Sequence, residues 1–245
     1  MKKLILILLV ALPFAVHAQN HQYIVDTATE LVDGYLRMMN HRYLPEDSLV
    51  VIDTRVTIVG TTDTFVMKRW YAQQQNHRVE VWHKGELQTA FYGNGLDHFR
   101  RYVRDGRYWE DVGPALMYRM LGGYDFRGPL FNWRTENLNL EYLGRAKTED
   151  GHSLRVVKVT GHNNFMRYYM FEESGLLTLF LESDTVGTNP IRSANHVDWK
   201  CFHEYLPVGH YLFPVQESFL RDGTLTVLES TVHFEPLDLT PFNQD

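Results

Sequence analysis

Histidine, cysteine and carboxylate side chains are the residues of this chain whose types and spacing could support chemistry. Three of the twelve histidines, His196, His203 and His210, recur at intervals of seven, with Asp198 and Glu204 close to them. Imidazole and carboxylate ligands together could hold a zinc ion. On an extended strand, however, residues seven apart point to opposite faces and lie more than about 20 Å apart. Solvated or edge histidines are therefore the simpler interpretation, and no metal is expected.

The single cysteine, Cys201, shares one strand face with Trp199 and His203 at a spacing of two residues. A thiol becomes a nucleophile only beside a group that lowers its pKa, so Cys201 is interpreted as a small buried hydrophobic residue. Glu172 and Glu173 are neighbours, which point in opposite directions on a strand and fit a turn better than a catalytic pair.

Sequence motifs of the common enzyme classes do not occur in the chain. It has no G-x-S-x-G, H-E-x-x-H or C-x-x-C motif, no phosphate-binding loop and no complete G-x-G-x-x-G. We therefore predict a protein that is not an enzyme and needs no cofactor. An enzyme with an unrecognised site is the least favoured alternative.

Composition and charge place the chain among ordinary globular proteins. Of its 245 residues, 44% are hydrophobic, 22% charged and 13% aromatic, which excludes a disordered or collagen-like chain. The formal net charge is −6, whereas nucleic-acid binders normally carry a basic field, so no nucleic-acid partner is expected. Abundant aromatic residues favour strands and apolar cavities over a bundle of helices.

The first residues have the pattern of a secretory signal peptide. Lys2 and Lys3 precede an apolar run at residues 4–10, and Val16 and Ala18 occupy the two positions that a signal peptidase inspects. A transmembrane anchor would need about 20 apolar residues, and no cysteine for lipid attachment follows the run. We expect cleavage after Ala18, export to the periplasm, and a single domain over residues 19–245.

One helix and a long series of strands follow from the spacing of apolar residues. Residues 23–40 repeat apolar side chains every three or four positions, at Ile24, Ala28, Leu31, Tyr35 and Met38, which is typical of an amphipathic helix. From residue 49 the period is two, and Lys84-Gly85 and Asp150-Gly151 are among the predicted hairpin turns. The predicted strands span residues 49–59, 65–71, 77–84, 86–92, 97–103, 107–111, 138–143, 153–160, 165–171, 176–182, 196–204, 212–221 and 224–235.

Strand periodicity fails between residues 113 and 135. Pro114 could begin a short helix, and Gly122-Gly123 would end it. The large apolar residues of this segment are Leu116, Met117, Met120, Leu121, Phe126, Leu130, Phe131 and Trp133. They form either plain core or a ligand-contacting surface, where methionine is adaptable. The whole pattern predicts a mainly β (α+β) fold, with an antiparallel sheet curved around one apolar interior and partly covered by helices.

Several short segments distributed over the mature chain carry a family resemblance. They are 65–69 (FVMKR), 78–81 (RVEV), 91–95 (FYGNG), 140–145 (LEYLGR), 150–154 (DGHSL), 170–177 (MFEESGLL), 213–215 (FPV) and 221–223 (RDG). In this order, behind an N-terminal helix, the chain resembles the LolA/LolB-like family of periplasmic lipoprotein carriers and the wider outer-membrane lipoprotein-sorting group. Trp70 stands where that family has proline, and Asn94 where it often has aspartate.

The resemblance implies an open sheet, like an unclosed barrel, with short lid helices over an apolar cavity that shields acyl chains. It implies that the 114–133 segment is the lid and that Phe65, Met67 and Arg69 face the cavity. Arg69 matches an arginine that latches the lid in the sorting carrier, and its period-two phase with Phe65 and Met67 independently points it inward. An inward arginine needs hydrogen-bond acceptors, which lid carbonyls would supply. Pairing with an acidic side chain at the sheet edge is the alternative.

The predicted function is a non-catalytic periplasmic carrier or binder of lipid or lipoprotein acyl chains. An envelope membrane protein is a further candidate partner, and the protein is expected to act as a monomer. The competing interpretation is a cell-envelope interaction protein that has the same fold but fills the cavity with its own side chains. An empty apolar hollow would favour the carrier, whereas convergent polar groups within it would favour an enzyme.

Overall fold

The structure is a computed structural model of the chain. It describes residues 21–41, 45–72, 76–94, 98–103, 108–111, 130–131, 133–135, 137–148, 150–161, 166–183, 198–221 and 223–238. The predicted signal peptide at residues 1–18 and most of the predicted lid lie outside the described residues.

The N-terminal helix, α1 (His21–Met39), has the predicted extent to within two residues at each end. Its buried stripe runs through Ala28, Val32, Tyr35 and Met39, each no more than 1% exposed, as a period of 3.6 residues requires. The predicted stripe ended at Met38 instead, which is 38% exposed. Four residues rather than three separate Tyr35 from the last buried position, so Met39 continues the stripe and Met38 lies beside it.

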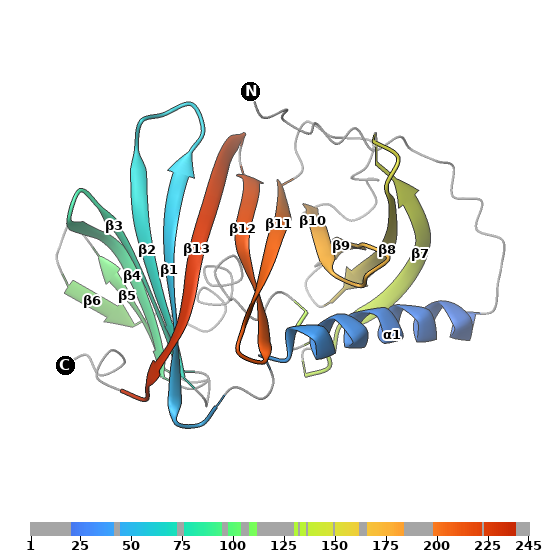
Figure 1. Cartoon of the computed structure of the whole chain (residues 1–245), viewed down its shortest axis with the longest axis horizontal. Coiled ribbons are helices and arrows are strands. Elements are labelled where there is room, and N and C mark those ends of the chain that lie inside the picture. The colour runs from blue at the N-terminus through green and yellow to red at the C-terminus, as the bar shows by residue number, and fades with distance from the viewer. Residues whose placement is uncertain are drawn as a thin grey trace. The chain divides into compact units, whose positions relative to one another are not determined.

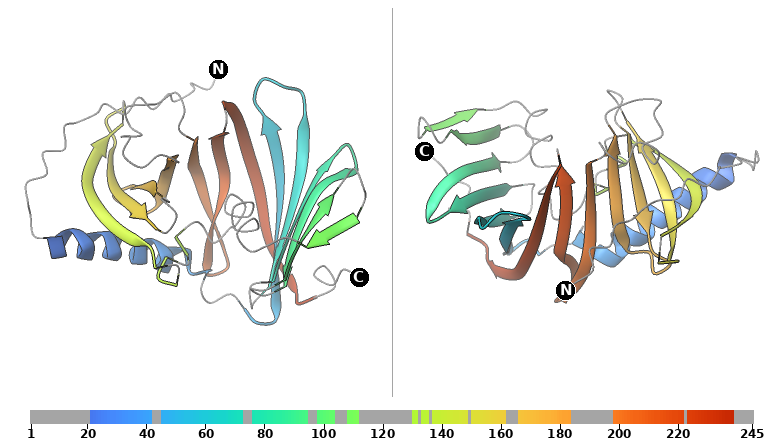
Figure 2. Two further views of the ribbon diagram at one scale, coloured as in Figure 1. Left: turned by 180° about the vertical axis from the view of Figure 1, so that it is seen from behind. Right: turned by 90° about the horizontal axis from the view of Figure 1, so that it is seen from above.

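Thirteen strands form one open antiparallel sheet, in the order β6-β5-β4-β3-β2-β1-β13-β12-β11-β10-β9-β8-β7 (Figures 1 and 2). All thirteen predicted strands are present, with β7 and β11 extending four residues beyond their predicted ends. Their bounds are β1 (Ser48–Ile58), β2 (Thr64–Tyr71), β3 (His77–His83), β4 (Glu86–Asn94), β5 (His98–Val103), β6 (Tyr108–Asp111), β7 (Asn139–Lys147), β8 (Ser153–Thr160), β9 (Met166–Phe171), β10 (Leu177–Ser183), β11 (Asp198–Val208), β12 (Tyr211–Arg221) and β13 (Thr224–Pro236).

Two consecutive meanders are joined by the pairing of β1 with β13. Ser48 lies opposite Pro236 and Ile58 opposite Thr226, so the two strands pair along their whole shared length. Within the first meander, the β3–β4 hairpin turns at Lys84 (φ 51°) and Gly85 (φ 81°). Two successive positive φ angles match the twist of a two-residue hairpin, as this dipeptide predicts.

The chain divides into two compact units, each of which contributes strands to the hydrogen-bonded order. One comprises Met1–Met38, Asn132–Phe202 and Phe219–Thr224 and contains β7 to β10; we call it the α1 unit. The other comprises Met39–Phe131, His203–Ser218 and Leu225–Asp245 and contains β1 to β6; we call it the β1 unit. The assignment of residues 19–245 to a single domain stays a prediction.

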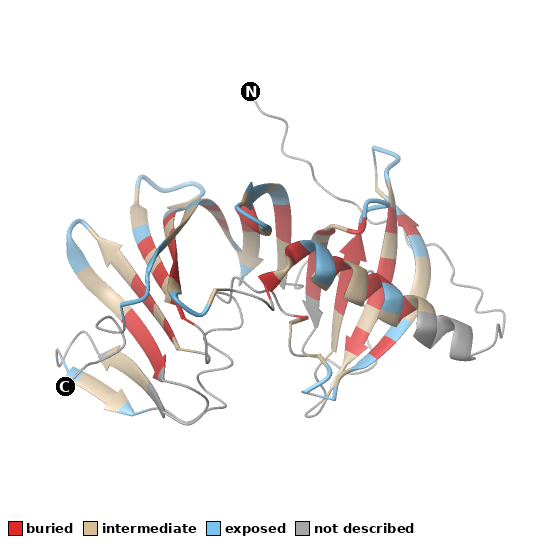
Figure 3. Ribbon diagram, turned by 60° about the horizontal axis from the view of Figure 1, so that its bottom comes forward, coloured by how far each residue is buried: buried red, intermediate tan, exposed pale blue. Residues whose placement is uncertain are grey.

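Buried residues recur along the strands of both units (Figure 3). In the α1 unit, the ring of Tyr35 meets that of Phe171 edge to face, with centroids 5.8 Å apart, and so fixes α1 against β9. In the β1 unit, Val50, Ile52, Tyr71 and Phe213 form one buried cluster. None of the helices in the described part of the chain has the length and apolarity that crossing a membrane requires.

Candidate functional site

The predicted cavity face lies in the β1 unit, on one side of β1, β2, β3 and β13. The alternation of β2 places Phe65, Met67 and Arg69 on the same face, and register sets Met67 opposite Thr54 and Arg69 opposite Ile52 of β1. Met67 is 1% exposed, and Phe65, near the hairpin end, is half-buried. This face is therefore shielded from water at its centre and open toward its rim.

Arg69 is the charged residue of this face and is only 3% exposed. Its Nη2 donates hydrogen bonds to Thr54 Oγ1 at 2.9 Å and to Ser230 Oγ at 3.3 Å, and the two hydroxyl oxygens lie 3.0 Å apart. The three side chains come from three adjacent strands, because register sets Thr54 opposite both Met67 of β2 and Ser230 of β13. Burial of a guanidinium requires such hydrogen bonds. We call these three residues the Arg69 cluster.

The surroundings of the Arg69 cluster are apolar. Ile52, directly opposite Arg69, is 2% exposed, and Val79 on the other neighbouring strand is fully buried. Further along the face, the ring of Phe213 packs against Phe234 with centroids 6.3 Å apart. A guanidinium with two hydroxyl partners is therefore held beside buried hydrocarbon and aromatic side chains.

Buried polar residues are distributed unequally between the two units. Among the described residues, all the buried polar or charged side chains belong to the β1 unit: His41, Thr54, Arg69, His77, Glu80, Glu217, Ser218 and Thr226. The described buried residues of the α1 unit are hydrophobic. Burial of polar groups requires hydrogen-bond partners, so the described part of the β1 unit has an interior of mixed polarity, whereas that of the α1 unit is apolar.

Comparison with known proteins relates this architecture to solved structures. No protein-family model and no curated protein sequence matches the chain. A LolA superfamily protein from Nitrosomonas europaea aligns over 89% of this chain and 97% of its own, with a TM-score of 0.57 and 12% identity. An outer membrane lipoprotein-sorting protein domain from Vibrio parahaemolyticus aligns over 86% and 97%, with the same TM-score and identity. The chain has the LolA fold.

A further solved structure with this fold is a DUF1329 family protein from Desulfovibrio piger, which aligns over 88% of this chain and 97% of its own at a TM-score of 0.55 and 12% identity. The predicted resemblance to LolA-like proteins is thus confirmed at the level of the fold. The roles of individual residues rest on the contacts that they make in this chain.

The LolA-like lid predicted at residues 114–133 is described only at its end. Leu116, Met117, Met120, Leu121 and Phe126 lie outside the described residues. Leu130 is fully buried and Phe131 half-buried, both in the β1 unit. Trp133 belongs to the α1 unit, where the guanidinium of Arg134 stacks over its ring at 4.2 Å. Lid helices, an apolar cavity and a latch at Arg69 therefore stay predictions.

Asp33 of α1 fixes the chain just after the predicted lid. Both of its carboxylate oxygens accept hydrogen bonds from Arg134, at 2.7 and 2.5 Å. This bidentate pair raises the pKa of Arg134, chiefly through the hydrogen bond to Asp33. The junction between the predicted lid and β7 is thus anchored to the helix by the ion pair of Asp33 with Arg134.

A cluster of aromatic and cationic side chains from β2, β3 and β6, which the sequence analysis missed, includes residues on the opposite face of β2 and β3. The guanidinium of Arg78 lies 5.8 Å from the ring centroids of both Trp70 and Trp109. Arg78 Nε donates to Glu80 at 2.8 Å, and Trp82 Nε1 donates to the other oxygen of Glu80 at 2.9 Å. The Arg-x-Glu spacing was visible in the sequence. The tryptophans that stack on Arg78 come from other strands, however, and could be identified only once the pairing of the strands was known.

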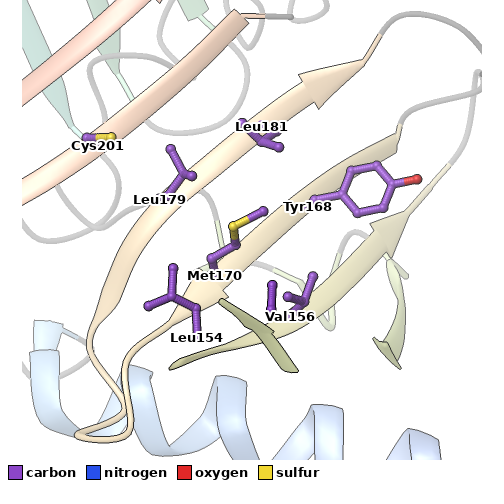
Figure 4. Close-up of a cluster of buried hydrophobic side chains, with 8 residues drawn as sticks. Leu154, Val156, Tyr168, Met170, Leu179, Leu181 and Cys201 are labelled. Atoms are coloured by element: carbon purple, nitrogen blue, oxygen red, sulfur yellow. The ribbon is translucent and has the colours of Figure 1, made fainter. Parts of the chain in front are cut away.

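Cys201 is a buried hydrophobic residue, as predicted. It is 7% exposed and packs with Leu179, Leu181 and Met170 in an apolar cluster of the α1 unit (Figure 4). Burial raises the pKa of its thiol to about 12. At neutral pH the thiol is protonated and shielded, which removes the property that a cysteine nucleophile needs.

The candidate zinc ligands are not brought together where the structure describes them. His203 Nε2 lies 2.7 Å from Ser218 Oγ on the neighbouring strand, and burial lowers the pKa of His203. The backbone carbonyl of His210 accepts a hydrogen bond from Asn40, and His196 lies outside the described residues. The described part of the chain holds no group of three histidine, cysteine or acidic side chains that could bind a metal ion.

Proposed function

We propose that this protein is a non-catalytic envelope protein that binds lipid or lipoprotein acyl chains on the Arg69-bearing face of the β1 unit. The observation that carries the proposal is the Arg69 cluster, a hydrogen-bonded guanidinium inside an apolar face. Replacing buried charges by apolar side chains of similar volume is often neutral or stabilising. A binding role for this face accounts for the retention of a charge that folding does not need.

An acyl chain is the ligand whose chemistry fits this face. Each methylene group that it buries contributes about 0.8 kcal/mol, and Ile52, Met67 and Val79 offer it a hydrocarbon surface. These three residues are at most 2% exposed, so a ligand must displace whatever covers them. We assign that cover to the 114–133 segment, of which Leu130 is fully buried. Arg69 would then bind lid carbonyls or the polar end of the ligand.

The non-catalytic part of the proposal rests on the chemistry of the Arg69 cluster. A hydroxyl becomes a nucleophile when a neighbouring base accepts its proton. The hydroxyls of Thr54 and Ser230 instead face each other and a guanidinium, which is always protonated and cannot accept a proton. The described members of the cluster thus position polar atoms without supplying a base.

The cellular setting belongs to the same proposal. Residues 1–18 would direct the chain across the inner membrane and be removed after Ala18, leaving a periplasmic protein. The LolA fold is compatible with exchange of acyl chains between envelope membranes, and an envelope membrane protein would receive or deliver the ligand. The mature chain would act as a monomer.

Complete burial at the centre of the face favours a second candidate function. Phe213, Val79 and Leu130 are each fully buried within the chain itself, which is what a self-filled cavity requires. The protein would then be an envelope interaction protein that keeps the LolA fold without carrying lipid. The two candidates differ in whether an acyl chain can enter.

Titration of the delipidated mature protein with dansyl-undecanoic acid separates these two functions. Energy transfer from the tryptophans of β2 and β3 reports binding. Phe65→Asp puts a charge at the half-buried rim of the face, whereas Val66→Asp is its matched control, because Val66 is the next residue, points to the other face and is 52% exposed.

The carrier proposal predicts saturable binding that Phe65→Asp weakens at least about tenfold, since removing more than about 1.4 kcal/mol of apolar contact has that effect. Val66→Asp should leave the affinity within about twofold. No saturable binding up to the solubility limit of the probe would contradict the carrier and support the self-filled interaction protein.

A further inference from the structure

A groove in the α1 unit carries an inference that is independent of the acyl-chain proposal. It is lined by α1, by Arg155 of β8 and by Ser174 and Gly175 of the β9–β10 turn. Its volume is about 530 Å³, and it is open to solvent. The helix contributes Thr27, Glu30, Leu31, Gly34, Tyr35, Arg37 and Met38.

Charged side chains stand at different positions along this groove. Glu30 and Arg37 are exposed on the same groove-lining face of α1, and neither has an ion pair with another described residue. Seven residues of α-helix separate them by about 10 Å along the axis. Arg155 adds a second guanidinium to the lining, so the groove has an acidic position at Glu30 and basic positions at Arg37 and Arg155.

The neighbouring acidic groups are already engaged, which leaves these charges available to a ligand. Glu173 pairs with Arg145 at 3.2 Å, Glu172 accepts a hydrogen bond from Thr178 at 2.9 Å, and Asp33 pairs with Arg134. Arg155 itself is held in place by Nη2, which donates to the backbone carbonyls of Glu172 and Glu173 at 2.9 and 3.1 Å. Among the described residues, none accepts a hydrogen bond from its Nη1, so this nitrogen can donate to a bound carboxylate.

The groove contains two glycines, Gly175 and Gly34, and the structure of the chain explains only the first. Gly175 has φ 93°, a backbone conformation that favours glycine, and an added Cβ would lie 2.8 Å from the flexible end of the Met38 side chain, so the backbone of the turn requires glycine. Gly34 lies within α1, where glycine is less favourable than alanine. An added Cβ at Gly34 would meet nothing closer than Arg37 Nη2 at 3.9 Å. Packing within the chain therefore does not require Gly34, whereas a ligand passing over the helix would.

The geometry points to a docking groove for a peptide in the polyproline II conformation that carries an acidic and a basic side chain three residues apart. This conformation has three residues per turn and advances about 3.1 Å per residue, so the two side chains lie on the same side of the peptide and about 9 Å apart, close to the distance between Glu30 and Arg37. The acidic side chain would pair with Arg37 and Arg155, and the basic one with Glu30. The bare backbone at Gly34 would accommodate the residues between them, beside the flexible side chain of Met38.

An open groove of mixed polarity suits a peptide better than a small ligand. Small-molecule sites are mostly apolar and enclose most of the ligand surface. This groove is instead lined partly by charged side chains and is open to solvent. Its opposite charges also discriminate against a purely apolar segment, which would leave Glu30 and Arg37 without partners. The expected occupant is thus a segment of an envelope protein with the stated charge spacing.

Nuclear magnetic resonance titration of the mature protein with short capped peptides tests this inference. The probes are acetyl-Asp-Ala-Ala-Lys-amide and the reversed acetyl-Lys-Ala-Ala-Asp-amide, with acetyl-Ala-Ala-Ala-Ala-amide as the uncharged control. At least one charged peptide should give saturable shifts at the amides of Thr27–Met38 and Ser174–Gly175, and the control should give none. Absence of saturable shifts with both charged peptides, or equal shifts with the control, would overturn the inference.

Two variants make the test specific. Gly34→Ala should raise the melting temperature by about 2–4 °C, because alanine favours the helix, while it weakens peptide binding at least about fivefold. A lower melting temperature, or unchanged binding, would make Gly34 a structural residue and contradict the inference. Arg37→Glu should abolish the shifts, whereas Glu229→Lys, an exposed charge reversal in the β1 unit, should leave them unchanged. Loss of binding in both, or in neither, would contradict the charge pairing.

Discussion

The α1 unit and the β1 unit use the same antiparallel construction but fill their interiors with different chemistry. In the α1 unit, described buried side chains such as Phe171 and Met170 are hydrophobic. In the β1 unit, Arg69 and Thr54 are buried on the same strands as Ile52 and Met67. An antiparallel meander evidently folds around hydrophobic residues alone. The buried polar residues of the β1 unit therefore distinguish it from the α1 unit, and they are the reason why we proposed that the β1 unit binds the ligand.

The stability of the α1 unit should depend on individual apolar contacts. Phe171→Ala removes a fully buried ring that packs against Tyr35 and should lower the free energy of unfolding by about 3–5 kcal/mol. Urea denaturation measures this loss. Glu173→Ala, two residues away and exposed, should change it by less than about 0.5 kcal/mol. Similar losses in both variants would show that the turn, rather than the apolar core, sustains this unit.

The burial of Cys201 in the apolar core of the α1 unit should also make its thiol unreactive. Because burial raises the pKa of Cys201 to about 12, the thiolate fraction falls about a thousandfold below that of an ordinary thiol. The native protein at pH 8 should therefore react with Ellman's reagent at least about a hundredfold more slowly than the urea-unfolded protein. Rapid reaction of the native protein would mean that water reaches this core, and the contrast between the units would fail.

In the β1 unit, Arg69→Leu should change ligand release more than it changes stability. Leucine fills much of the volume, and the loss of the hydrogen bonds to Thr54 and Ser230 is offset by the desolvation cost of the guanidinium that leucine removes, while the two hydroxyls keep each other as partners. We expect the off-rate of dansyl-undecanoic acid to change about tenfold, with the melting temperature within a few degrees of the wild type. Stopped-flow fluorescence and a thermal melt measure the two quantities.

A matched control for Arg69→Leu is Arg55→Leu, which removes an exposed arginine from the other face of the neighbouring strand. It should alter neither quantity. An unchanged off-rate in Arg69→Leu would remove this residue from the binding site. A collapse of its thermal melt would identify Arg69 as a structural core residue.

Much of the fold was predictable because its signals are local. The period of two along β1, the Lys84-Gly85 turn and the spacing of Ala28 and Tyr35 each depend on a few neighbouring residues. Thr54 also carried a local signal, since a hydroxyl occupied the apolar phase of its strand. Its meaning required the register, because Ser230 reaches Thr54 only through the pairing of β1 with β13.

The features that sequence reasoning could not supply all depend on long-range pairing. The sandwich of Arg78 between Trp70 and Trp109 joins different strands, and the groove beside Gly34 needs the β9–β10 turn. The buried stripe of α1 ends at Met39 rather than at the predicted Met38. This is a smaller error of the sequence analysis, and it reflects how the helix packs on the sheet. Spacing along the chain contains none of this information.

The smallest expected effect concerns His203 and the dependence of the melting temperature on pH. Burial lowers the pKa of His203, partly opposed by Glu217, so the folded state binds a proton less readily than the unfolded state. Its stabilising contribution is present above the ordinary pKa near 6.5 and is lost as the pH falls below it. His203→Gln should flatten the decline of melting temperature between about pH 7 and pH 5 by less than about 2 °C. A steeper decline in the variant would reverse the assigned sign.

Photo-crosslinking with a diazirine-labelled fatty acid tests most directly that the β1 unit binds acyl chains. The delipidated mature protein would be irradiated with the probe, digested, and the labelled residues located by mass spectrometry. Our account predicts labels on the Arg69-bearing face, at Met67 and its neighbours on β1 and β3, that excess unlabelled palmitate suppresses. Labels confined to the α1 unit, around Met170 and Cys201, or no labelling that palmitate suppresses, would contradict it.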